Sequence, residues 1–369
     1  MSEVYQIVNS INAQTMGDTA IAVTDTASLV AMGDAILSSP TSTECWLNTL
    51  LQRVGRTVLS YRAYTNPLSL LAIDDMRYGA ILQKIKIEMP SAIEDVSVDL
   101  TDGQSIDMYT VSKPRAKQKL FVKRTPFVIK VTIQTKWLRE AFTSEEAMSA
   151  FISAIFGEVR NSLELSQENL ARLTIGNFIA NMGNAQIIPL RTNYNTLTGQ
   201  TLTEDTCLLD NGFLRYAIGQ MQLYSLKMST MNTLYNKEGE QRHTPYELQN
   251  FITIADFETA MRTQVEYSAF HETAVSKGAN IVVPYWQSAD SPFDLSLQIG
   301  GDEEAPVTKE MSNIIGIISD RDAFGTYRME ENVATTPLNA YGLYYNTFYH
   351  VNNLYFNDMS EQAVVFTLN

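Results

Sequence analysis

The feature that most constrains this chain is residues 57–138, where one alternating segment follows another with no helix between them. Alternation of polar and apolar residues predicts half-buried strands. Six runs show it: Thr57–Tyr64, Ile81–Met89, Val96–Leu100, Ser105–Val111, Lys119–Val122 and Phe127–Thr135. Asp102-Gly103 lies between two of these runs and indicates a β-hairpin. Because compact domains rarely contain so long an uncovered excursion, we expect another molecule to bury these strands.

Charge separates sharply within this stretch. From Ile87 to Ser112 there are six acidic residues and no basic one, whereas from Lys113 to Arg139 there are nine basic residues and no acidic one. Three interpretations are open: a stripe that binds nucleic acid, a solvated strand face, or complementarity between copies of the same protein. We favour the third, because opposite charges on two copies orient subunits and disfavour wrong contacts.

The overall charge limits the possible partners. The chain has 27 Lys and Arg against 41 Asp and Glu, a formal net charge of −14. Tight binding of DNA or RNA over the whole surface needs Lys and Arg that replace phosphate counterions, so the balance argues against it. A negative surface that only encloses nucleic acid is compatible with this charge. The N-terminus lacks the pattern of a signal peptide and no apolar run is long enough to span a membrane, so we expect synthesis in the cytoplasm.

The N-terminal region is acidic and rich in small residues. Residues 1–52 contain five acidic residues and no Lys or Arg, and Thr15–Ile36 show little amphipathic pattern. This composition predicts an extended arm that lies against something else, with a plain mobile terminus as the alternative. Apolar residues then recur at helical spacing and predict a short docked helix: Trp46, Leu47, Leu50, Leu51 and Val54.

The clearest predicted helix covers residues 143–182. Thr143 and Glu146 have the spacing of a capping box, and Gly183 stands where a left-handed C-terminal cap is expected. Its apolar stripe recurs every three or four positions, at Met148, Phe151, Ile152, Ile155, Phe156, Val159 and Leu163. A helix of this length is expected to act as a strut across a flat molecule.

The rest of the chain predicts a mixed domain followed by strands. Within 184–320, helical stripes lie at Phe213–Met231 and Asp256–Ala274, and strand-like runs lie at Phe251–Ile254, Ile281–Tyr285 and Ile314–Ser319. This alternation predicts a compact α/β domain. Residues 321–369 return to strands. Tyr341–Phe356 is aromatic-rich, which predicts a strand packed on both faces, and Ala363–Leu368 is a short closing strand.

No pattern of catalytic or metal-binding residues stands out. The histidines, His243, His271 and His350, lack the spacing of metal ligands, and Cys45 and Cys207 are expected to be small buried residues. There is no nucleophile elbow, phosphate-binding loop or dinucleotide fingerprint. Asp302, Glu303 and Glu304 form an exposed turn that is only a weak candidate for a hard cation. We therefore predict no catalytic residue, no cofactor, no metal site and no enzymatic activity.

The order of these parts resembles the HK-97-like capsid fold, an α+β fold. Local motifs make the chain similar to the major head proteins of phi-29-like short-tailed phages. The motifs are Thr65-Asn66-Pro67-Leu68 with Tyr78-Gly79, Arg124-Thr125-Pro126-Phe127-Val128, Phe142 with Ala150–Ile155, Leu248–Asp256 with Met261-Arg262, Asp320-Arg321-Asp322-Ala323-Phe324, and Gly342–Val351.

The resemblance implies a division of the chain. Residues 1–56 would be an N-terminal arm and 57–138 an extended β-hairpin loop that lies over the neighbouring subunit. Residues 139–195 would carry the spine helix of a peripheral domain, 196–320 an inserted axial α/β domain, and 321–369 the closing strands of the peripheral domain. Some relatives carry an immunoglobulin-like domain after the last strand, and we expect none here, because the chain stops at Asn369.

The resemblance also implies a function and partners. The protein would be a major capsid protein of a tailed bacteriophage that forms hexamers and pentamers in an icosahedral shell around double-stranded DNA. A separate scaffolding protein, a portal protein at one vertex, and assembly in the host cytoplasm would follow, with no membrane partner. The alternatives are an encapsulin-like compartment shell, a tail or decoration protein, and an enzyme whose site is assembled from distant residues.

Overall fold

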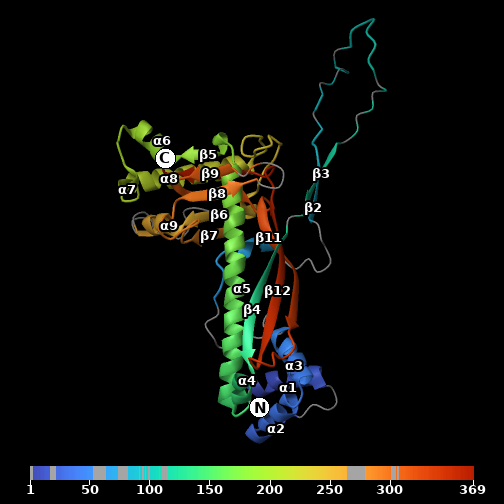
Figure 1. Ribbon diagram of the computed structural model, residues 1–369. Helices are drawn as coiled ribbons and strands as arrows, with labels where there is room; N and C mark the ends of the chain where they lie inside the picture. Colours follow the sequence, from blue (N-terminus) through green and yellow to red (C-terminus); the bar gives the residue numbers. More distant parts are fainter. Residues whose placement is uncertain are drawn as a thin grey trace.

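A computed structural model describes residues 3–16, 22–52, 64–73, 82–263, 279–300, 305 and 307–369, except 91, 94, 96, 99, 108, 110, 112, 114 and 123. One long helix, α5, runs the length of an elongated body (Figure 1). A mixed α/β region surrounds one end of α5, a group of short helices surrounds the other, and a two-stranded ribbon projects away from the body. The predicted α+β class is confirmed.

Helix α5 spans Glu145–Asn181, and its 37 residues at about 1.5 Å each give a length of roughly 55 Å. Its N-cap is Ser144, whose hydroxyl accepts a hydrogen bond from the Ala147 N–H at 3.1 Å. The predicted capping box is therefore wrong by one residue, because Thr143 donates its hydroxyl to the Glu140 carbonyl of the preceding turn instead.

The predicted left-handed cap at the end of α5 is also wrong. Gly183 has φ −81° and ψ 159°, an extended conformation. The chain does not reverse direction at this point. It continues through the short helix η3 (Asn184–Gln186) into β5 (Ile187–Pro189), so no left-handed residue is needed.

A four-stranded sheet lies along the first half of α5. Its order is β1-β11-β12-β4, with β1 Ala72–Ile73, β11 Phe324–Thr335, β12 Tyr344–Asn357 and β4 Arg124–Gln134. The residue before β1 closes the short helix η2 (Ser69–Leu71). On β12, buried residues alternate with half-exposed ones. The prediction that this aromatic strand is packed on both faces is therefore wrong within one chain, because α5 covers only one face of the sheet.

A five-stranded sheet forms the other end of the body. Its order is β5-β13-β10-β6-β7, with β13 Ala363–Thr367, β10 Ile314–Asp320, β6 Gln249–Ile254 and β7 Ala279–Val283. Every residue of β6, β10 and β13 is buried. The three strand predictions inside 184–320 are thus confirmed. The sequence groups Ala363–Leu368 with the strands before it, yet β13 pairs with β10 and β5 in this second sheet.

Helices and a small hairpin accompany the five-stranded sheet. They are α6 Leu190–Thr198, α7 Glu204–Cys207, α8 Asn211–Ser229, η4 Tyr246–Leu248, α9 Ala255–Met261, and the strands β8 Leu295–Ile299 and β9 Val307–Met311. Helix α8 confirms the first predicted stripe, and α9 confirms the start of the second, whose residues 264–274 lie outside the described residues.

The N-terminal region is helical, with α1 Glu3–Met16, α2 Thr26–Leu37 and α3 Pro40–Gln52 packed near α4 Thr135–Ala141 (Figure 1). The prediction of an extended arm over Thr15–Ile36 is wrong for the part that lies in α1 and α2, whereas residues 17–21 lie outside the described residues. Small residues that weaken the amphipathic pattern serve close packing here, because a Cβ on Gly33 would lie 2.6 Å from Phe142. The docked helix predicted around Trp46 is confirmed by α3.

Two hydrophobic cores result, and α5 contributes to both. Its first half places Met148, Ile152, Phe156, Val159 and Leu163 in the core beneath the four-stranded sheet and the N-terminal helices. Its second half places Ala171, Ile175, Phe178 and Ile179 in the core of the five-stranded sheet. The helix therefore joins the two cores, as a strut would.

Candidate functional site

The ribbon that projects from the body consists of β2 (Leu82–Ile87) and β3 (Ala116–Phe121), paired antiparallel. One further backbone bond, from the Glu88 N–H to the Arg115 carbonyl at 2.8 Å, extends the pairing. At the tip, the Gln104 N–H bonds the Thr101 carbonyl at 3.2 Å and Gly103 has φ +83°. A turn at Asp102-Gly103 is therefore confirmed.

The predicted strands Val96–Leu100 and Ser105–Val111 are wrong at every position that the structure describes. These residues form the extended arms between the paired base and the tip (Figure 1). Two separated chain segments without a neighbour cannot complete a hydrogen-bond ladder, so their alternation does not produce a strand within one molecule. Except for Tyr64, the predicted strand Thr57–Tyr64 lies outside the described residues.

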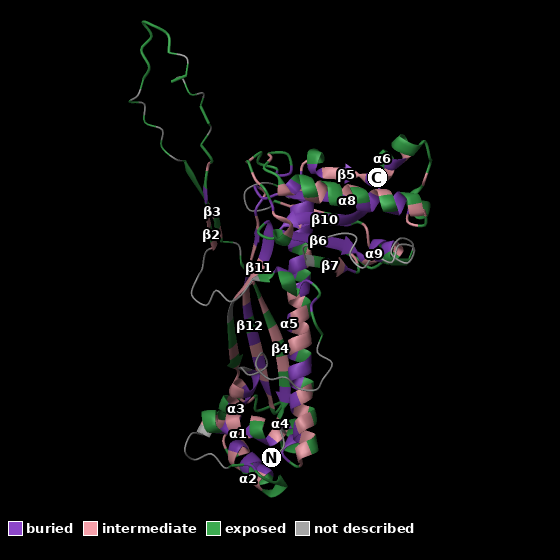
Figure 2. Ribbon diagram, turned by 180° about the vertical axis from the view of Figure 1, so that it is seen from behind, coloured by how far each residue is buried: buried purple, intermediate pink, exposed green. Residues whose placement is uncertain are grey.

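The ribbon exposes an unusual amount of apolar surface. In the arms, Ile93 is 89% exposed, Tyr109 81%, Val98 79%, Val111 77% and Leu100 70%. Figure 2 shows the ribbon as an almost continuously exposed segment, in contrast to the buried strands of the body. A contiguous group of exposed large apolar residues marks a surface that another molecule covers.

On the paired base of the ribbon, lysines face the body and apolar side chains face solvent, the reverse of the usual arrangement. On β2, Ile85 and Ile87 are 64% and 70% exposed, whereas Lys84 and Lys86 turn toward the body. Lys84 lies opposite Lys119 of β3, and Lys86 lies opposite Lys117. Like charges placed directly across a strand pair destabilise it, so these four lysines require negative charge nearby.

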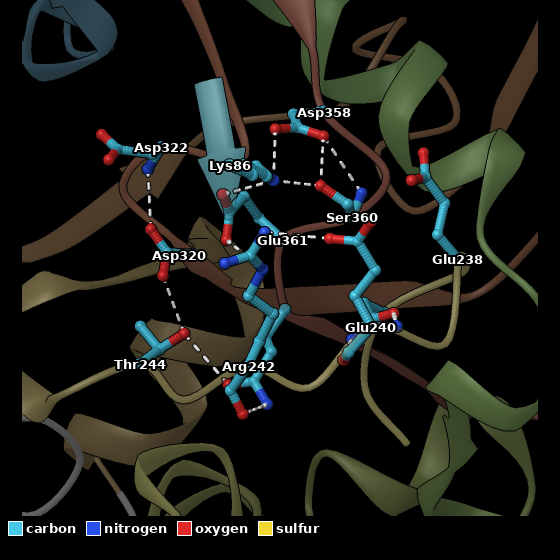
Figure 3. Close-up of polar contacts among 12 residues, drawn as sticks. Lys86, Glu238, Glu240, Arg242, Thr244, Asp320, Asp322, Asp358, Ser360 and Glu361 are labelled. Atoms are coloured by element: carbon cyan, nitrogen blue, oxygen red, sulfur yellow. Dashed lines mark hydrogen bonds and ion pairs between the residues drawn. The ribbon is translucent and has the colours of Figure 1, made fainter. Parts of the chain in front are cut away.

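Acidic residues of the body supply that charge (Figure 3). Lys84 and Lys86 each lie 2.9 Å from Asp358, and they lie 2.7 and 2.8 Å from Glu361. Asp358 is fully buried in the connection between β12 and β13. The lysine ammonium groups therefore converge on the segment that links the two sheets.

The β3 lysines bind neighbouring acids. Lys119 contacts Asp358 at 3.0 Å and also Glu238, and Lys117 contacts Glu240 at 3.2 Å. Lys117 also contacts Glu88 of the same ribbon at 2.9 Å. Part of the basic run that begins at Lys113 is thus neutralised within the chain, so the predicted complementarity between copies does not draw on all of it.

The connection that carries Asp358 is itself held in place. Ser360 donates both its N–H and its hydroxyl to Asp358 Oδ1, at 3.1 and 2.7 Å. The Asp358 N–H bonds the Ala323 carbonyl at 2.7 Å. Burial alone would raise the pKa of Asp358, but the hydrogen bonds from Ser360, Lys84 and Lys86 together hold it well below its usual range.

For the other ionisable groups of this cluster, burial and the hydrogen-bonding partners shift the pKa in opposite directions. Burial opposes ionisation of Glu361, yet its hydrogen bonds with Lys84 and Lys86 lower its pKa. Burial opposes the charge of Lys84 and Lys119, yet their carboxylate partners raise the pKa of both. Asp320 accepts hydrogen bonds from the Thr244 hydroxyl and the Asp322 N–H, but burial outweighs them and raises its pKa.

A groove of about 700 Å³ opens between the ribbon base and residues 238–243. Its lining alternates acidic and basic side chains, among them Glu88, Lys117, Glu240 and Arg242. In the described part of the chain, no three His, Cys, Asp or Glu residues come together as metal ligands. The cation candidates Asp302, Glu303 and Glu304 lie outside the described residues, as does His271.

The remaining residues singled out in the sequence do not form a site. His243 is exposed and borders this groove. His350 is also exposed, but it lies on β12 and does not line the groove. Cys207 is buried as predicted, whereas Cys45 is exposed, which corrects that prediction. The residues that the sequence missed are Asp358 and Glu361, and the alternating lysines of β2 and β3 were the available signal that acids would face them.

Comparison with known proteins decides what this architecture is. The model of the family described as "Phi29-like phage major capsid protein" matches residues 5–367. The chain belongs to this family. The projecting ribbon is therefore a feature of a phi29-like capsid subunit.

Curated relatives agree with the family. The major capsid protein of Bacillus phage GA-1 is 22% identical over 381 residues, covering 99% of this chain and 70% of the relative. That of Bacillus phage PZA is 23% identical over 382 residues, covering 99% and 73%. This phi29-like capsid chain is accordingly a structural shell protein of a tailed phage, it forms oligomeric assemblies, and its place is the virion capsid.

Solved structures agree on the fold. A chain in the capsid structure of Staphylococcus phage Andhra matches with a TM-score of 0.55 at 11% identity, covering 85% of this chain and 87% of that one. A chain in the structure of the head fiber and inner core protein gp22 of native bacteriophage P68 matches with a TM-score of 0.57 at 11% identity and the same coverage. The HK-97-like fold predicted from the sequence is confirmed. In the described part of the chain, no helix combines the length and hydrophobicity needed to cross a bilayer.

Proposed function

We propose that copies of this chain assemble, as hexamers and pentamers, into a closed icosahedral head shell around packaged double-stranded DNA. The observation that supports this most directly is the ribbon, most of whose described large apolar side chains from Ile85 to Val122 are between 50% and 89% exposed. In a shell, the ribbon of one subunit lies across the next subunit and these side chains are buried there. Many such contacts, each modest, add up to a stable closed particle.

Each predicted domain has its own role in the shell. Residues 57–138 act as the extended loop between subunits, 139–195 and 321–369 form the peripheral domain, and 196–320 form the axial domain that meets its copies around the symmetry axes. The pairing of β13 with β10 supports one change to these bounds, because it adds the end of the chain to the axial domain. Residues 1–56 form the N-terminal arm, whose described helices α1, α2 and α3 pack against the peripheral domain.

The proposal includes the other components of a head. A separate scaffolding protein guides assembly in the host cytoplasm, and a portal protein occupies one vertex. The net charge of −14 keeps the inner wall from trapping DNA, which the shell contains without reading its sequence. The chain has no catalytic role in this scheme.

Deletion of residues 90–112 tests the proposal. The deletion removes the exposed arms and the tip but leaves the paired base, since Glu88 and Arg115 still close the ladder. We expect the body to fold, with an unchanged far-ultraviolet circular dichroism minimum for α5, and shells to be absent in negative-stain micrographs of protein expressed with its scaffold. Normal shells from the deleted chain would refute the proposed role of the ribbon.

A further inference from the structure

The ribbon is attached to the body almost entirely through side chains. Strands β2 and β3 form a sheet of their own, and no described backbone hydrogen bond joins them to another element. Besides the covalent chain, the described contacts include the lysine–carboxylate pairs, a hydrogen bond from Lys86 to the Ser360 hydroxyl, one ring contact between Phe121 and Phe356 at 5.4 Å, and the bond from Lys84 Nζ to the Asp322 carbonyl at 3.1 Å.

Four lysines occupy the face of the ribbon base that turns to the body, and four carboxylates receive them: Glu238, Glu240, Asp358 and Glu361. Two of these carboxylates, Glu240 and Glu361, also pair with Arg242 of the body. The ion pairs of the ribbon base also differ in how far their side chains are buried. The side chains of Lys86 and Asp358 are 8% and 0% exposed, whereas those of Lys117 and Glu88 are 51% and 40% exposed. Solvent screens the buried pair least, so this is the pair whose disruption from one side should cost most.

This arrangement fixes which face of the ribbon points outward. Since side chains alternate along a strand, turning the lysines inward turns Ile85, Ile87 and Leu120 outward, where they are 64%, 70% and 54% exposed. A rotation of the ribbon would bury these apolar residues against its own body and would leave Asp358 without its cations. Breaking a buried pair from one side is costly, so the rotation is opposed.

We infer that Asp358 and Glu361 are positioning residues for assembly. They anchor the lysine face of the ribbon, and thereby set the angle of the ribbon and present its apolar face to a second copy of this chain. Both residues lie in the connection between β12 and β13. The angle of the ribbon therefore depends on the position of this connection in the body. The inference rests on the proposed function, in which the ribbon contacts a neighbour.

The test measures the ribbon angle in the unassembled full-length subunit. Spin labels on Gln118→Cys of the paired ribbon base and Thr196→Cys of α6, in a Cys45→Ser background, report a base-to-body distance by pulsed electron–electron resonance. The unaltered subunit should give one narrow maximum. Asp358→Asn should broaden the distribution or shift its maximum, and so should the ribbon-side pair Lys84→Gln with Lys86→Gln.

Two comparisons keep the result decisive. Glu140→Gln removes an exposed pair with Lys136, 3.9 Å apart and away from the ribbon, and should leave the distance unchanged. If Asp358→Asn fails to fold, the lysine variants decide, because they lie outside both cores. A distribution as narrow as the original in every folded variant overturns the inference. That outcome leaves the proposed function intact, since shell formation by the chain lacking residues 90–112 is judged separately.

Discussion

At the scale of residues, the deciding feature is a reversal of the usual preference for burying apolar side chains. On β2, the lysines turn inward and the isoleucines turn outward. Within one chain this arrangement exposes apolar surface and concentrates positive charge, and both are unfavourable unless other groups compensate. Buried carboxylates of the body compensate for the charge, and a neighbouring subunit is the remaining way to cover the isoleucines.

The ionic attachment should respond to pH in a defined direction. Asp358 and Glu361 have lowered pKa values, so their stabilisation is complete above the unfolded-state value of about 4 and is lost as pH falls through the lowered values. Lys84 and Lys119 have raised pKa values, so their contribution is complete below about pH 10 and is lost above it. Asp320, with its raised pKa, takes up a proton before the other two carboxyls.

We therefore expect the distance from the ribbon base to the body to stay constant between about pH 6 and pH 9, and to change on acidification below about pH 4 and at alkaline pH above about 10. The other charged neighbours are Glu238, Glu240, Lys117 and Arg242, and burial of Glu240 is outweighed by hydrogen bonds from Lys117 and Arg242 that lower its pKa. The same spin-labelled subunit, titrated with buffer, gives the measurement. Release of the ribbon near neutral pH would contradict this account of the cluster.

At the scale of elements, α5 holds two otherwise separate cores together. Phe178 is fully buried, and its ring lies 5.0 Å from that of Phe324, at the start of β11. Phe178→Ala should lower the free energy of unfolding by about 3–5 kcal/mol, because it removes a large buried ring and leaves a cavity. Leu165→Ala on the same helix is the control, since Leu165 is 53% exposed and its loss should cost little. Equal losses in chemical denaturation would show that Phe178 does not anchor the second half of α5 in the core of the five-stranded sheet.

Elements with strong local patterns could be predicted from the sequence. The stripe of α5, the apolar runs of β6, β10 and β13, and the turn at Asp102-Gly103 all follow from residue spacing. Helix α2 could not, because its small residues give little contrast between faces and its helical state depends on packing against Phe142. The pairing of β13 with β10 also depends on long-range contacts that no local pattern encodes.

For the candidate site, too, one part could be predicted from the sequence and another part could not. The exposed ribbon was predicted because alternating segments without a covering helix need an outside partner. The cluster around Asp358 was not, because it joins residues such as Lys86 and Glu361 that lie far apart in the sequence. Its acids stand alone between apolar strands, where a single sequence gives no indication of which cations they meet.

At the scale of the whole molecule, the account rests on a division between a body with two complete cores and a ribbon with none. The body is stable by its own packing, whereas the ribbon arms bury almost nothing within the chain. A subunit of this form is suited to a closed shell, where every ribbon has a neighbour and every body receives one. The same division explains why deletion of the arms should leave a folded subunit that cannot assemble.

The most direct measurement is a cryo-electron microscopy reconstruction of the assembled particle at side-chain resolution. The account predicts that Val98, Leu100 and Tyr109, which are 79%, 70% and 81% exposed in the single chain, are buried against an adjacent copy. It also predicts that the Asp358 cluster is intact at the ribbon base. A closed particle in which these side chains face solvent, or in which the ribbon folds back on its own body, would contradict the account.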